Sequence, residues 1–454
     1  MLKQLLESDK FKLEFETLLA DFIEIQSISN DPKYKNDCDL AADFIVQFLD
    51  KIDFNVTKVQ TPGLPIVYAE KIFSQDAKTV LIYAHYDVMP ADEEGWETDP
   101  FKLVKKDGNF YGRGVSDDKG QLLMQLVALK LLHEEGFNGL NFKILFEGEE
   151  EAGSDNLEPF IKDNLNLLDS DFVIVSDTTL VSEDIPGLVS SVRGAILFDV
   201  TIENSKLDLH SGVFGGMVNN PANLMANLIT ALKDKDKKVS LEGFYDDVLE
   251  YGSDYRKDLK VLDEISFDKA TLKNYGVVKD SRENGYTAFE CATIRPSFDI
   301  NGFHSGFQGE GSKTIIPSFA NAKFSFRLVA NQDPLFIEKS FMSFCRDYFP
   351  DGVNVNISSL GHYYPYSVDE SCNYVNLALE VLTDIFGNKA YLMPCGGSIP
   401  IAYLFKKYLK IETVFMGFGL ETDNIHGPNE RILAKNVFRG IESIVSYYKK
   451  IVEL

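Results

Sequence analysis

His85 and Asp87 lie one residue apart at the end of the strand-like run TVLIYAHYDV. In an extended strand, residues two positions apart point to the same side, so these two side chains face one direction. An imidazole that binds a metal commonly needs a carboxylate on its other ring nitrogen, and this spacing supplies one. The pair also suits a half-buried histidine beside a turn aspartate, so by itself it leaves both interpretations open.

A second pair of carboxylates, Asp117 and Asp118, lies in the segment YGRGVSDDKGQ ahead of a long helical pattern. Aspartate is a preferred helix cap, and Gly112 and Gly114 suit a turn. Capping the helix requires only one of the two carboxylates. The other one is available for different chemistry.

Four glutamates follow the apolar run NFKILF, namely Glu147, Glu149, Glu150 and Glu151. An acidic run is usually a solvated face of the protein. At the end of a strand, however, like charges repel one another unless a cation or a proton intervenes. The run is therefore a candidate ligand segment as well as a candidate surface feature.

Two further residues end strand-like segments in the same manner. Asp177 closes the run DFVIVSD, and His426 lies in LETDNIHGPNE, after the run IETVFMGFG. One arrangement satisfies all of these segments: two cations bridged by a carboxylate, with a spare glutamate as the base for water. Nitrogen and oxygen ligands of this type suit Zn²⁺, Mn²⁺ or Co²⁺. The chemistry predicted from these residue types is amide hydrolysis.

The elements that must position these residues alternate between strand and helix as far as about residue 189. This alternation predicts an α/β fold with a mixed, largely parallel sheet, helices on both faces, and functional residues at the carboxyl ends of the strands. Long strand-like runs separated by helices then predict an antiparallel α+β unit, before the α/β pattern returns near residue 369. We expect a catalytic domain formed by 1–189 and 369–454, with a second domain inserted at 190–368.

The chain has 454 residues and a formal net charge of −25. A surface this acidic repels phosphate backbones and anionic lipids, so nucleic acids and membranes are not expected partners. The five cysteines form no CxxC pair, which favours a reducing compartment. No window approaches the roughly 20 apolar residues of a membrane span, and residues 1–26 have the pattern of a helix rather than of a signal peptide. We expect a soluble, cytoplasmic protein.

Five motifs follow one another along the chain: HYDVMPA, GWETDPFKLVKKDGNFYGRGVSDDKG, EGEEEAGS, SDT and NIHGPNE. In order and spacing they resemble the co-catalytic, binuclear zinc metallopeptidase family of carnosinase-type dipeptidases, aminoacylases, succinyl-diaminopimelate desuccinylase and glutamate carboxypeptidase. The resemblance spans nearly the whole chain and is closest to the carnosinase-like dipeptidases. It implies a metal-dependent hydrolase that cleaves the amide bond of dipeptides or short peptides.

The resemblance implies two divalent metal ions per subunit, Zn²⁺ first, with Mn²⁺ or Co²⁺ as alternatives. The implied ligands of one ion are His85, Asp117 and Asp177. Those of the other ion are Asp117, Glu151 and His426, so that Asp117 bridges the two. In the family, the peptide bond that follows the bridging aspartate is cis.

Other residues have implied roles around these ligands. Glu150 matches the general base that takes a proton from the water between the metals and returns it to the leaving amine. Asp87 would orient His85. Glu147 and Glu149 would then be solvated bystanders.

The inserted domain resembles the family's lid and dimerisation domain, a ferredoxin-like α+β unit. His210, in DLHSGVFGG, would reach the active site of a neighbouring subunit and stabilise the oxyanion there. Arg327, in KFSFRLVANQ, matches the position that holds the substrate carboxylate, and Ser398 and Gly397, in PCGGSIP, would contact the substrate. The expected assembly is a homodimer formed through the lid domain.

Two alternatives to a peptidase stay open at this point. An N-acyl amino acid deacylase, of the aminoacylase or desuccinylase type, would use the same metal site with a different substrate pocket. An inactive binding protein on the same fold is a more remote alternative, because fold does not imply function. The presence of every implied ligand and of Glu150 argues against such a loss of activity.

Overall fold

The computed structural model describes residues 2–266, 276–279 and 281–454, and the chain forms two compact units. The first unit consists of Met1–Ser190, Val368–Met393 and Leu404–Leu454. The second unit consists of Ser191–Ser367 and Pro394–Tyr403. Residues 394–403, which include Gly397 and Ser398, belong by their contacts to the second unit, whereas the predicted segment 369–454 assigns them to the catalytic domain.

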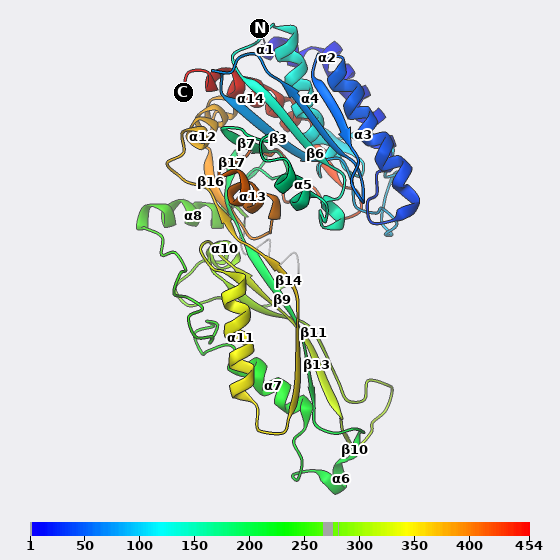
Figure 1. The fold of residues 1–454 in the computed structure, drawn as a ribbon, viewed down its shortest axis with the longest axis vertical. Helices are drawn as coiled ribbons and strands as arrows, with labels where there is room; N and C mark the ends of the chain where they lie inside the picture. Colours follow the sequence, from blue (N-terminus) through cyan, green and yellow to red (C-terminus); the bar gives the residue numbers. More distant parts are fainter. Residues whose placement is uncertain (1, 267–275, 280) are drawn as a thin grey trace. The chain divides into compact units, whose positions relative to one another are not determined.

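The first unit is built on a mixed β-sheet with the strand order β1-β2-β6-β3-β7-β17-β8-β15, in which β16 also pairs with β8 (Figure 1). The central strands β6, β3, β7 and β17 run parallel, whereas β1, β2 and β8 pair antiparallel with their neighbours. The bounds are β1 Asn55–Val59, β2 Ile66–Lys71, β3 Thr79–His85, β6 Asn141–Glu147, β7 Phe172–Val175, β8 Gly187–Val192, β16 Tyr391–Cys395 and β17 Glu412–Phe415. A smaller sheet contains β4 Val104–Lys106, β5 Asn109–Tyr111 and β18 Arg431–Leu433. The predicted mixed α/β sheet is confirmed.

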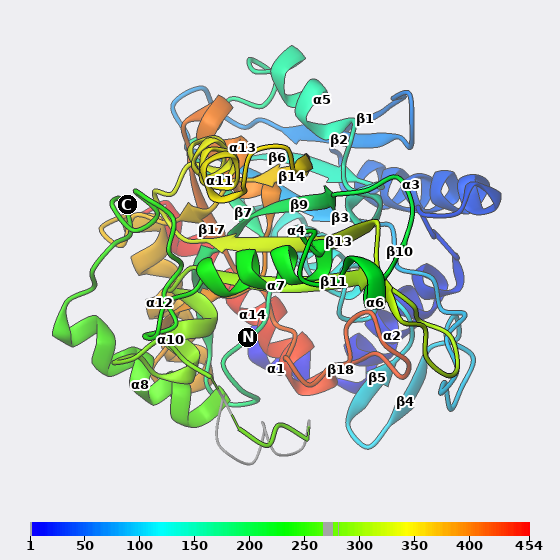
Figure 2. The same ribbon diagram turned by 90° about the horizontal axis from the view of Figure 1, so that it is seen from below.

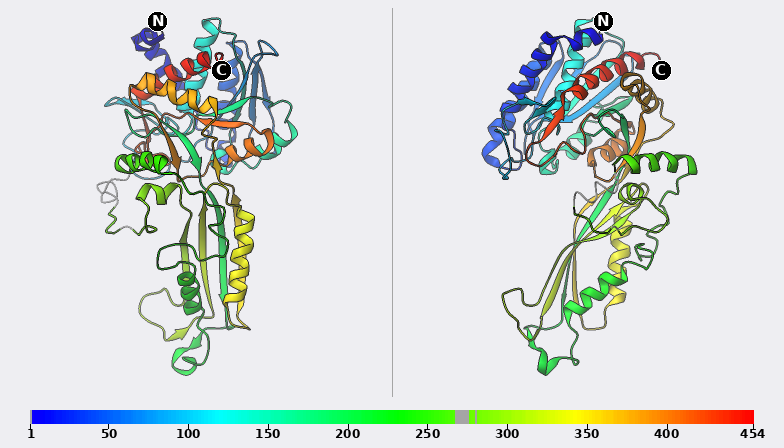
Figure 3. Two further views of the ribbon diagram at one scale, coloured as in Figure 1. Left: turned by 90° about the vertical axis from the view of Figure 1, so that its left-hand side faces the viewer. Right: turned by 180° about the vertical axis from the view of Figure 1, so that it is seen from behind.

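Helical segments cover both faces of the large sheet. They are α1 Leu2–Glu7, α2 Asp9–Glu24, α3 Lys35–Asp50, α4 Lys119–Glu134, α5 Leu157–Asp163, α12 Asn373–Phe386, α14 Ala434–Ile451, the short 3₁₀ turns η1 Pro32–Tyr34 and η2 Glu150–Ala152, and the π-helical segment η3 Phe405–Leu409. On one face, the ring of Phe172 stacks on Tyr374 of α12, with 4.2 Å between ring centroids. Val80 of β3 is the register partner of Phe172, so its side chain points to the same face. Tyr83 lies three residues further along β3 and therefore points to the opposite face. There its ring centroid lies 5.8 Å from that of Phe405. Figure 3 shows α14, in red, beside α12, in orange.

The second unit follows the chain order β9-α7-β11-β13-α11-β14 around an antiparallel sheet with the strand order β11-β13-β9-β14. This is the βαββαβ arrangement of a ferredoxin-like fold, and Figure 2 shows α7 running along the sheet. The bounds are β9 Gly194–Glu203, β10 Leu209–His210, α6 Ser211–Phe214, α7 Pro221–Ala231, α8 Ser253–Ser266, α10 Ala288–Thr293, β11 Ser297–Ser305, β12 Ile315–Ile316, β13 Phe319–Leu328, α11 Pro334–Tyr348, β14 Asn354–Tyr363, β15 Tyr366–Ser367 and α13 Pro400–Leu404. Alternate residues of β9, such as Phe198 and Val200, form its core with Met225 of α7 and Phe341 of α11. The predicted α+β fold is confirmed, whereas the role as a lid and dimerisation domain stays a prediction.

Neither unit contains a helix, among the described residues, with the length and apolar character needed to cross a membrane.

Candidate metal centre

Three neighbouring strands of the first unit end with a polar residue at the same edge of the sheet. His85 is the last residue of β3, Glu147 is the last residue of β6, and Asp177 lies two residues beyond the end of β7. Because β3 runs parallel to β6 and β7, these carboxyl ends meet. The sheet topology therefore brings these polar side chains close together, although they are far apart in the sequence.

Asp117 lies between two histidines. Its Oδ1 atom is 3.0 Å from Nε2 of His85, and its Oδ2 atom is 2.9 Å from Nε2 of His426. Oδ2 of Asp177 is 3.8 Å from Nε2 of His85, and Oε1 of Glu151 is 3.1 Å from Nε2 of His426. These side chains form two groups of three that share Asp117, and within each group the ligand atoms lie within 4.8 Å of one another. The structure thus brings together all five residues for which the sequence predicted metal binding.

The donor set of these two groups fits divalent cations. Imidazole nitrogen together with carboxylate oxygen is the ligand combination that Zn²⁺, Mn²⁺ and Co²⁺ accept. The two groups combine three carboxylates with two imidazoles, so negative charge is in excess when the imidazoles are neutral. The peptide bond between Asp117 and Asp118 is cis, as the family resemblance implied.

In the absence of a cation, this group of side chains retains protons. Hydrogen bonds to Asp117 and Glu151 raise the pKa of His426 to about 10. Burial lowers the pKa of His85, but hydrogen bonds to Asp117 and to a second aspartate outweigh burial and raise that pKa well above its usual value. Burial raises the pKa of Asp177 to about 7, and the charge of Asp117 adds to the effect. Since a ligand must lose its proton to bind a metal, protons and cations compete for this site.

Asp87 is buried and binds three partners. Its Oδ1 atom is 3.3 Å from Nδ1 of His85 and also accepts a hydrogen bond from the backbone N–H of Glu150 at 3.3 Å. Its Oδ2 atom accepts a hydrogen bond from the backbone N–H of Glu151 at 3.0 Å. Asp87 therefore lies beside His85, as predicted, and also connects the end of β3 to the turn η2. The sequence offered no sign of this second connection.

Glu150 begins the turn η2 and is partly buried. Burial raises the pKa of its carboxyl group to about 7; the charge of His85 opposes this shift, and the charges of Asp177 and Asp117 increase it. A carboxyl group that titrates near neutral pH is suited both to accept a proton and to return it.

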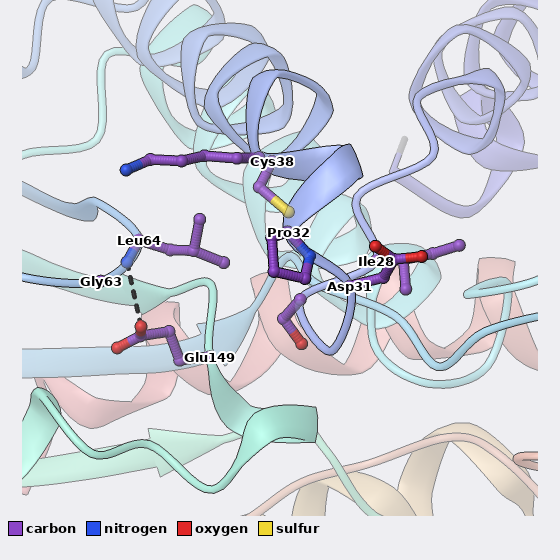
Figure 4. A pocket seen from close by; sticks show the side chains of 9 residues that line it. Ile28, Asp31, Pro32, Cys38, Gly63, Leu64 and Glu149 are labelled. Atoms are coloured by element: carbon purple, nitrogen blue, oxygen red, sulfur yellow. Dashed lines mark hydrogen bonds between the residues drawn. The ribbon is translucent and has the colours of Figure 1, made fainter.

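Of the other two glutamates of the acidic run, Glu147 is buried, contrary to the expectation of a solvated residue, whereas Glu149 is partly exposed and hydrogen-bonded. Glu147 is only 2% exposed, its Oε1 atom accepts a hydrogen bond from the Tyr83 hydroxyl at 2.5 Å, and burial raises its pKa to about 8. Glu149 Oε1 accepts a hydrogen bond from the backbone N–H of Leu64 at 3.0 Å, at the wall of a pocket (Figure 4), and its Oε2 accepts one from Asn156 at 2.8 Å. The run occupies a strand end and a tight turn instead of a helix face, so successive carboxylates enter different surroundings.

The predicted substrate-binding residues gather in the second unit. Arg327 of β13 donates a hydrogen bond from Nη1 to Oγ of Ser398 at 3.3 Å, and Ser398 Oγ donates to the carbonyl oxygen of Arg193 at 2.6 Å. The carbonyl oxygen of Gly397 accepts a hydrogen bond from the backbone N–H of Arg193 at 2.9 Å. The structure therefore brings Arg327, Ser398 and Gly397 together around Arg193.

Sequence reasoning missed Arg193. Its Nε atom donates to the carbonyl oxygen of Gly396 at 3.0 Å, and burial together with the charge of Arg327 lowers its pKa to about 10. In the sequence it is a single cation next to the strand-like run AILFDVTIEN, and nothing in that local pattern separates it from a surface arginine. Its partner, the glycine-rich loop, follows about 200 residues later.

His210 is exposed at the start of the short helix α6. Its Nδ1 atom accepts a hydrogen bond from the backbone N–H of Gly212 at 3.0 Å. His210 belongs to the second unit, whereas the two metal groups belong entirely to the first. Its role in a neighbouring subunit stays a prediction.

Comparisons with known proteins agree with this geometry. The sequence profile of peptidase family M20/M25/M40 matches residues 81–450. The chain is 30% identical to the Cys-Gly metallodipeptidase dug1 of Schizosaccharomyces pombe, over 97% of this chain and 96% of that protein. Among solved structures, the M20 family metallo-carboxypeptidase Sso-CP2 from Sulfolobus solfataricus has a TM-score of 0.83 and 32% identity, covering 97% of this chain and 100% of that one. Human carnosine dipeptidase 1 has a TM-score of 0.78 and 26% identity, covering 100% and 99% of the two chains.

Proposed function

Since this chain belongs to peptidase family M20/M25/M40 and is a metal-dependent dipeptide hydrolase, we propose that its two groups of converging side chains hold two divalent cations. His85, Asp117 and Asp177 would bind one cation, and Asp117, Glu151 and His426 the other. The observation that carries this proposal is the position of Asp117, whose two carboxylate oxygens lie 3.0 and 2.9 Å from different histidines. Zn²⁺ is the cation we favour, ahead of Mn²⁺ and Co²⁺, because histidine nitrogen together with carboxylate oxygen is the donor set of hydrolytic zinc sites.

In the proposed reaction, Glu150 is the residue that moves the proton. Paired cations polarise the scissile carbonyl group and lower the pKa of the attacking water. Glu150 takes a proton from that water and delivers it to the leaving amine. Its position at the start of the turn η2, directly before the proposed ligand Glu151, supports this role. Asp87 keeps Glu150 and His85 in place through its hydrogen bond and its close contact with the imidazole.

The proposed substrates are dipeptides with a free carboxylate at the C-terminus. Arg327 would form a charge-assisted hydrogen bond with that carboxylate, and Ser398 and Gly397 would contact the substrate beside it. The contact between Arg327 and Ser398 supports this assignment. The names of the relatives make Cys-Gly and β-Ala-His the first peptides to test.

We further propose that the enzyme is a cytoplasmic homodimer. The five cysteines are all free, as suits a reducing compartment. Pairing through the second unit would allow His210 of one subunit to stabilise the oxyanion formed in its partner.

A hydrolysis screen tests the function. Purified protein is loaded with Zn²⁺, Mn²⁺ or Co²⁺ and offered Cys-Gly, β-Ala-His, other dipeptides and a matched set of N-acyl amino acids. We expect two metal ions per subunit and values of kcat/KM that are higher for dipeptides than for N-acyl amino acids. A preference for N-acyl amino acids would replace the peptidase with a deacylase, and a chain that binds no metal would overturn the proposal.

A further inference from the structure

Glu430 is a fully buried carboxylate that follows His426 by four residues in the motif NIHGPNE. Its Oε1 atom accepts hydrogen bonds from the backbone N–H groups of Ser116 at 2.9 Å and Asp117 at 3.1 Å. Its Oε2 atom accepts hydrogen bonds from the backbone N–H of Gly114 at 2.9 Å and from Nη1 of Arg113 at 2.9 Å. One side chain thus holds the backbone of the loop that carries Asp117.

The backbone around Glu430 adds further connections to the same loop. The carbonyl oxygen of Glu430 accepts a hydrogen bond from the N–H of Gly112 at 3.1 Å. The next residue, Arg431, pairs with Tyr111 in the small sheet formed by β18 and β5. The segment that presents His426 and the segment that presents Asp117 are therefore joined along their length, although they lie more than 300 positions apart.

Arg113 compensates the buried charge of Glu430. Its side chain is 1% exposed, and its Nη2 atom donates to the carbonyl oxygen of Pro90 at 3.0 Å and to Oε1 of Glu93 at 2.8 Å. Trp96 covers the guanidinium at 5.3 Å. Removing either partner of this buried ion pair would destabilise the fold, because the remaining charge would be buried without a counter-charge.

We propose that Glu430 is a positioning residue that sets Asp117 and His426 in their relative place before any cation binds. The inference rests on the proposed function, in which these two residues are ligands. A carboxylate is suited to the position because it offers only acceptor lone pairs to four donors. Glutamine would turn an NH₂ group toward at least one of the N–H donors, and aspartate, one methylene shorter, would not reach them all.

Metal affinity is the first test. Zn²⁺ affinity is measured by competition with a chromogenic chelator for the wild type, Glu430→Gln and Glu430→Asp, under conditions where each variant is folded by circular dichroism. We expect both variants to lose about 10- to 100-fold in affinity, the effect typical of residues that support ligands. If only the neutral variant, Glu430→Gln, lost affinity, Glu430 would act through its charge and the positioning role would be overturned.

Glu283→Gln provides the matched control for general destabilisation. Glu283 forms a buried carboxylate–guanidinium pair with Arg295, at 2.8 and 2.9 Å, and lies in the second unit. We expect this variant to unfold at lower denaturant concentration while retaining wild-type metal affinity. Glu430 variants that lost no more affinity than Glu283→Gln would contradict the proposal.

Hydrogen exchange of the metal-free wild type tests the proposal without any substitution. If Glu430 positions the loop in advance, the amide hydrogens of Gly114, Ser116 and Asp117 exchange slowly before Zn²⁺ is added. Fast exchange that becomes slow only after Zn²⁺ is added would overturn it, because the cation would then be the organiser. A wild-type chain that bound no Zn²⁺ would instead count against the proposed function, so the two failures are distinguishable.

Discussion

The metal centre of the first unit combines carboxylates with imidazoles, whereas the arginine group of the second unit holds two cations and, among the described residues, no carboxylate partner. In the first, three carboxylates and two imidazoles converge, and the carboxylates of Asp87 and Asp118 are fully buried close by. In the second, Arg193 and Arg327 make their hydrogen bonds to the neutral oxygens of Gly396 and Ser398. The comparison supports the proposal that the first region takes up cations and the second a substrate carboxylate.

The largest expected effect comes from removing the carboxylate shared by both metal groups. Asp117→Ala should abolish the binding of both cations and therefore hydrolysis. Asp177→Ala should weaken the binding of only one cation. The loss of affinity for Asp117→Ala should exceed the about 10- to 100-fold typical of residues that merely support ligands. Elemental analysis after gel filtration gives the number of ions retained. Equal stoichiometry in the two variants would contradict a shared ligand.

Replacing the proposed base, Glu150, should impair proton transfer without impairing metal binding in the first region. Glu150→Gln preserves the size of the side chain but cannot take a proton, so kcat should fall about 10²- to 10⁴-fold while two metals stay bound. Metal content is measured on the sample used for kinetics. Glu147→Gln is the matched control, since Glu147 belongs to the same run but bonds to Tyr83. A near-normal kcat for Glu150→Gln, or loss of its metals, would remove it from this role.

Removing the positive charge of Arg327 in the second region should lower kcat/KM only for substrates with a negatively charged C-terminus. Arg327→Ala should lower kcat/KM for dipeptides by about 10- to 100-fold, the value of a hydrogen bond between charged groups, and change it little for C-terminally amidated analogues that are still hydrolysed. Lys323→Ala, which removes an exposed cation from the same strand, is the control. Similar losses for acid and amide substrates would indicate a structural role for Arg327.

The smallest expected effect is a partial recovery of activity when two inactive variants exchange subunits, one altered in each region. His210→Ala and Glu150→Gln should each form nearly inactive homodimers. After equal mixing and subunit exchange, about half of the dimers contain one chain of each kind, and in these the chain with an intact Glu150 receives His210 from its neighbour. About a quarter of all sites should then work, as random pairing in a symmetric dimer requires. Activity that equals the sum of the unmixed samples, with exchange verified by mass spectrometry, would place His210 in its own subunit's site or in none.

Much of the metal centre was predictable because its chemistry restricts residue types. A histidine at a strand end, an aspartate pair in a glycine-containing turn and a histidine after another strand are unusual enough to be noticed in sequence. The strand–helix alternation then indicated which edge of the sheet would collect them. The acidic run was less informative, because Glu147, Glu149, Glu150 and Glu151 are chemically identical along the chain.

Only the tertiary structure decided which of these glutamates faces which partner. Glu147 ends a buried strand and bonds to Tyr83, whereas the turn η2, closed by Gly153 at a φ of 102°, redirects the residues that follow. Glycine is the residue that adopts this left-handed conformation without steric cost. The bonds of Asp87 to the turn and the position of Arg193 beside the glycine-rich loop were equally invisible, because both depend on segments that are distant in sequence.

By itself, then, the sequence determined the residue types proposed to bind metal, the alternation of elements and the two fold classes, because side-chain chemistry and local periodicity act over a few residues. The tertiary structure decided the partners of each charge: Glu430 with the loop that carries Asp117, Asp87 with the turn η2, and Arg193 with the carbonyl oxygen of Gly396. The physical reason is that burial, hydrogen bonding and pKa depend on which groups share a small volume, and folding brings those groups together from positions as far as 317 residues apart.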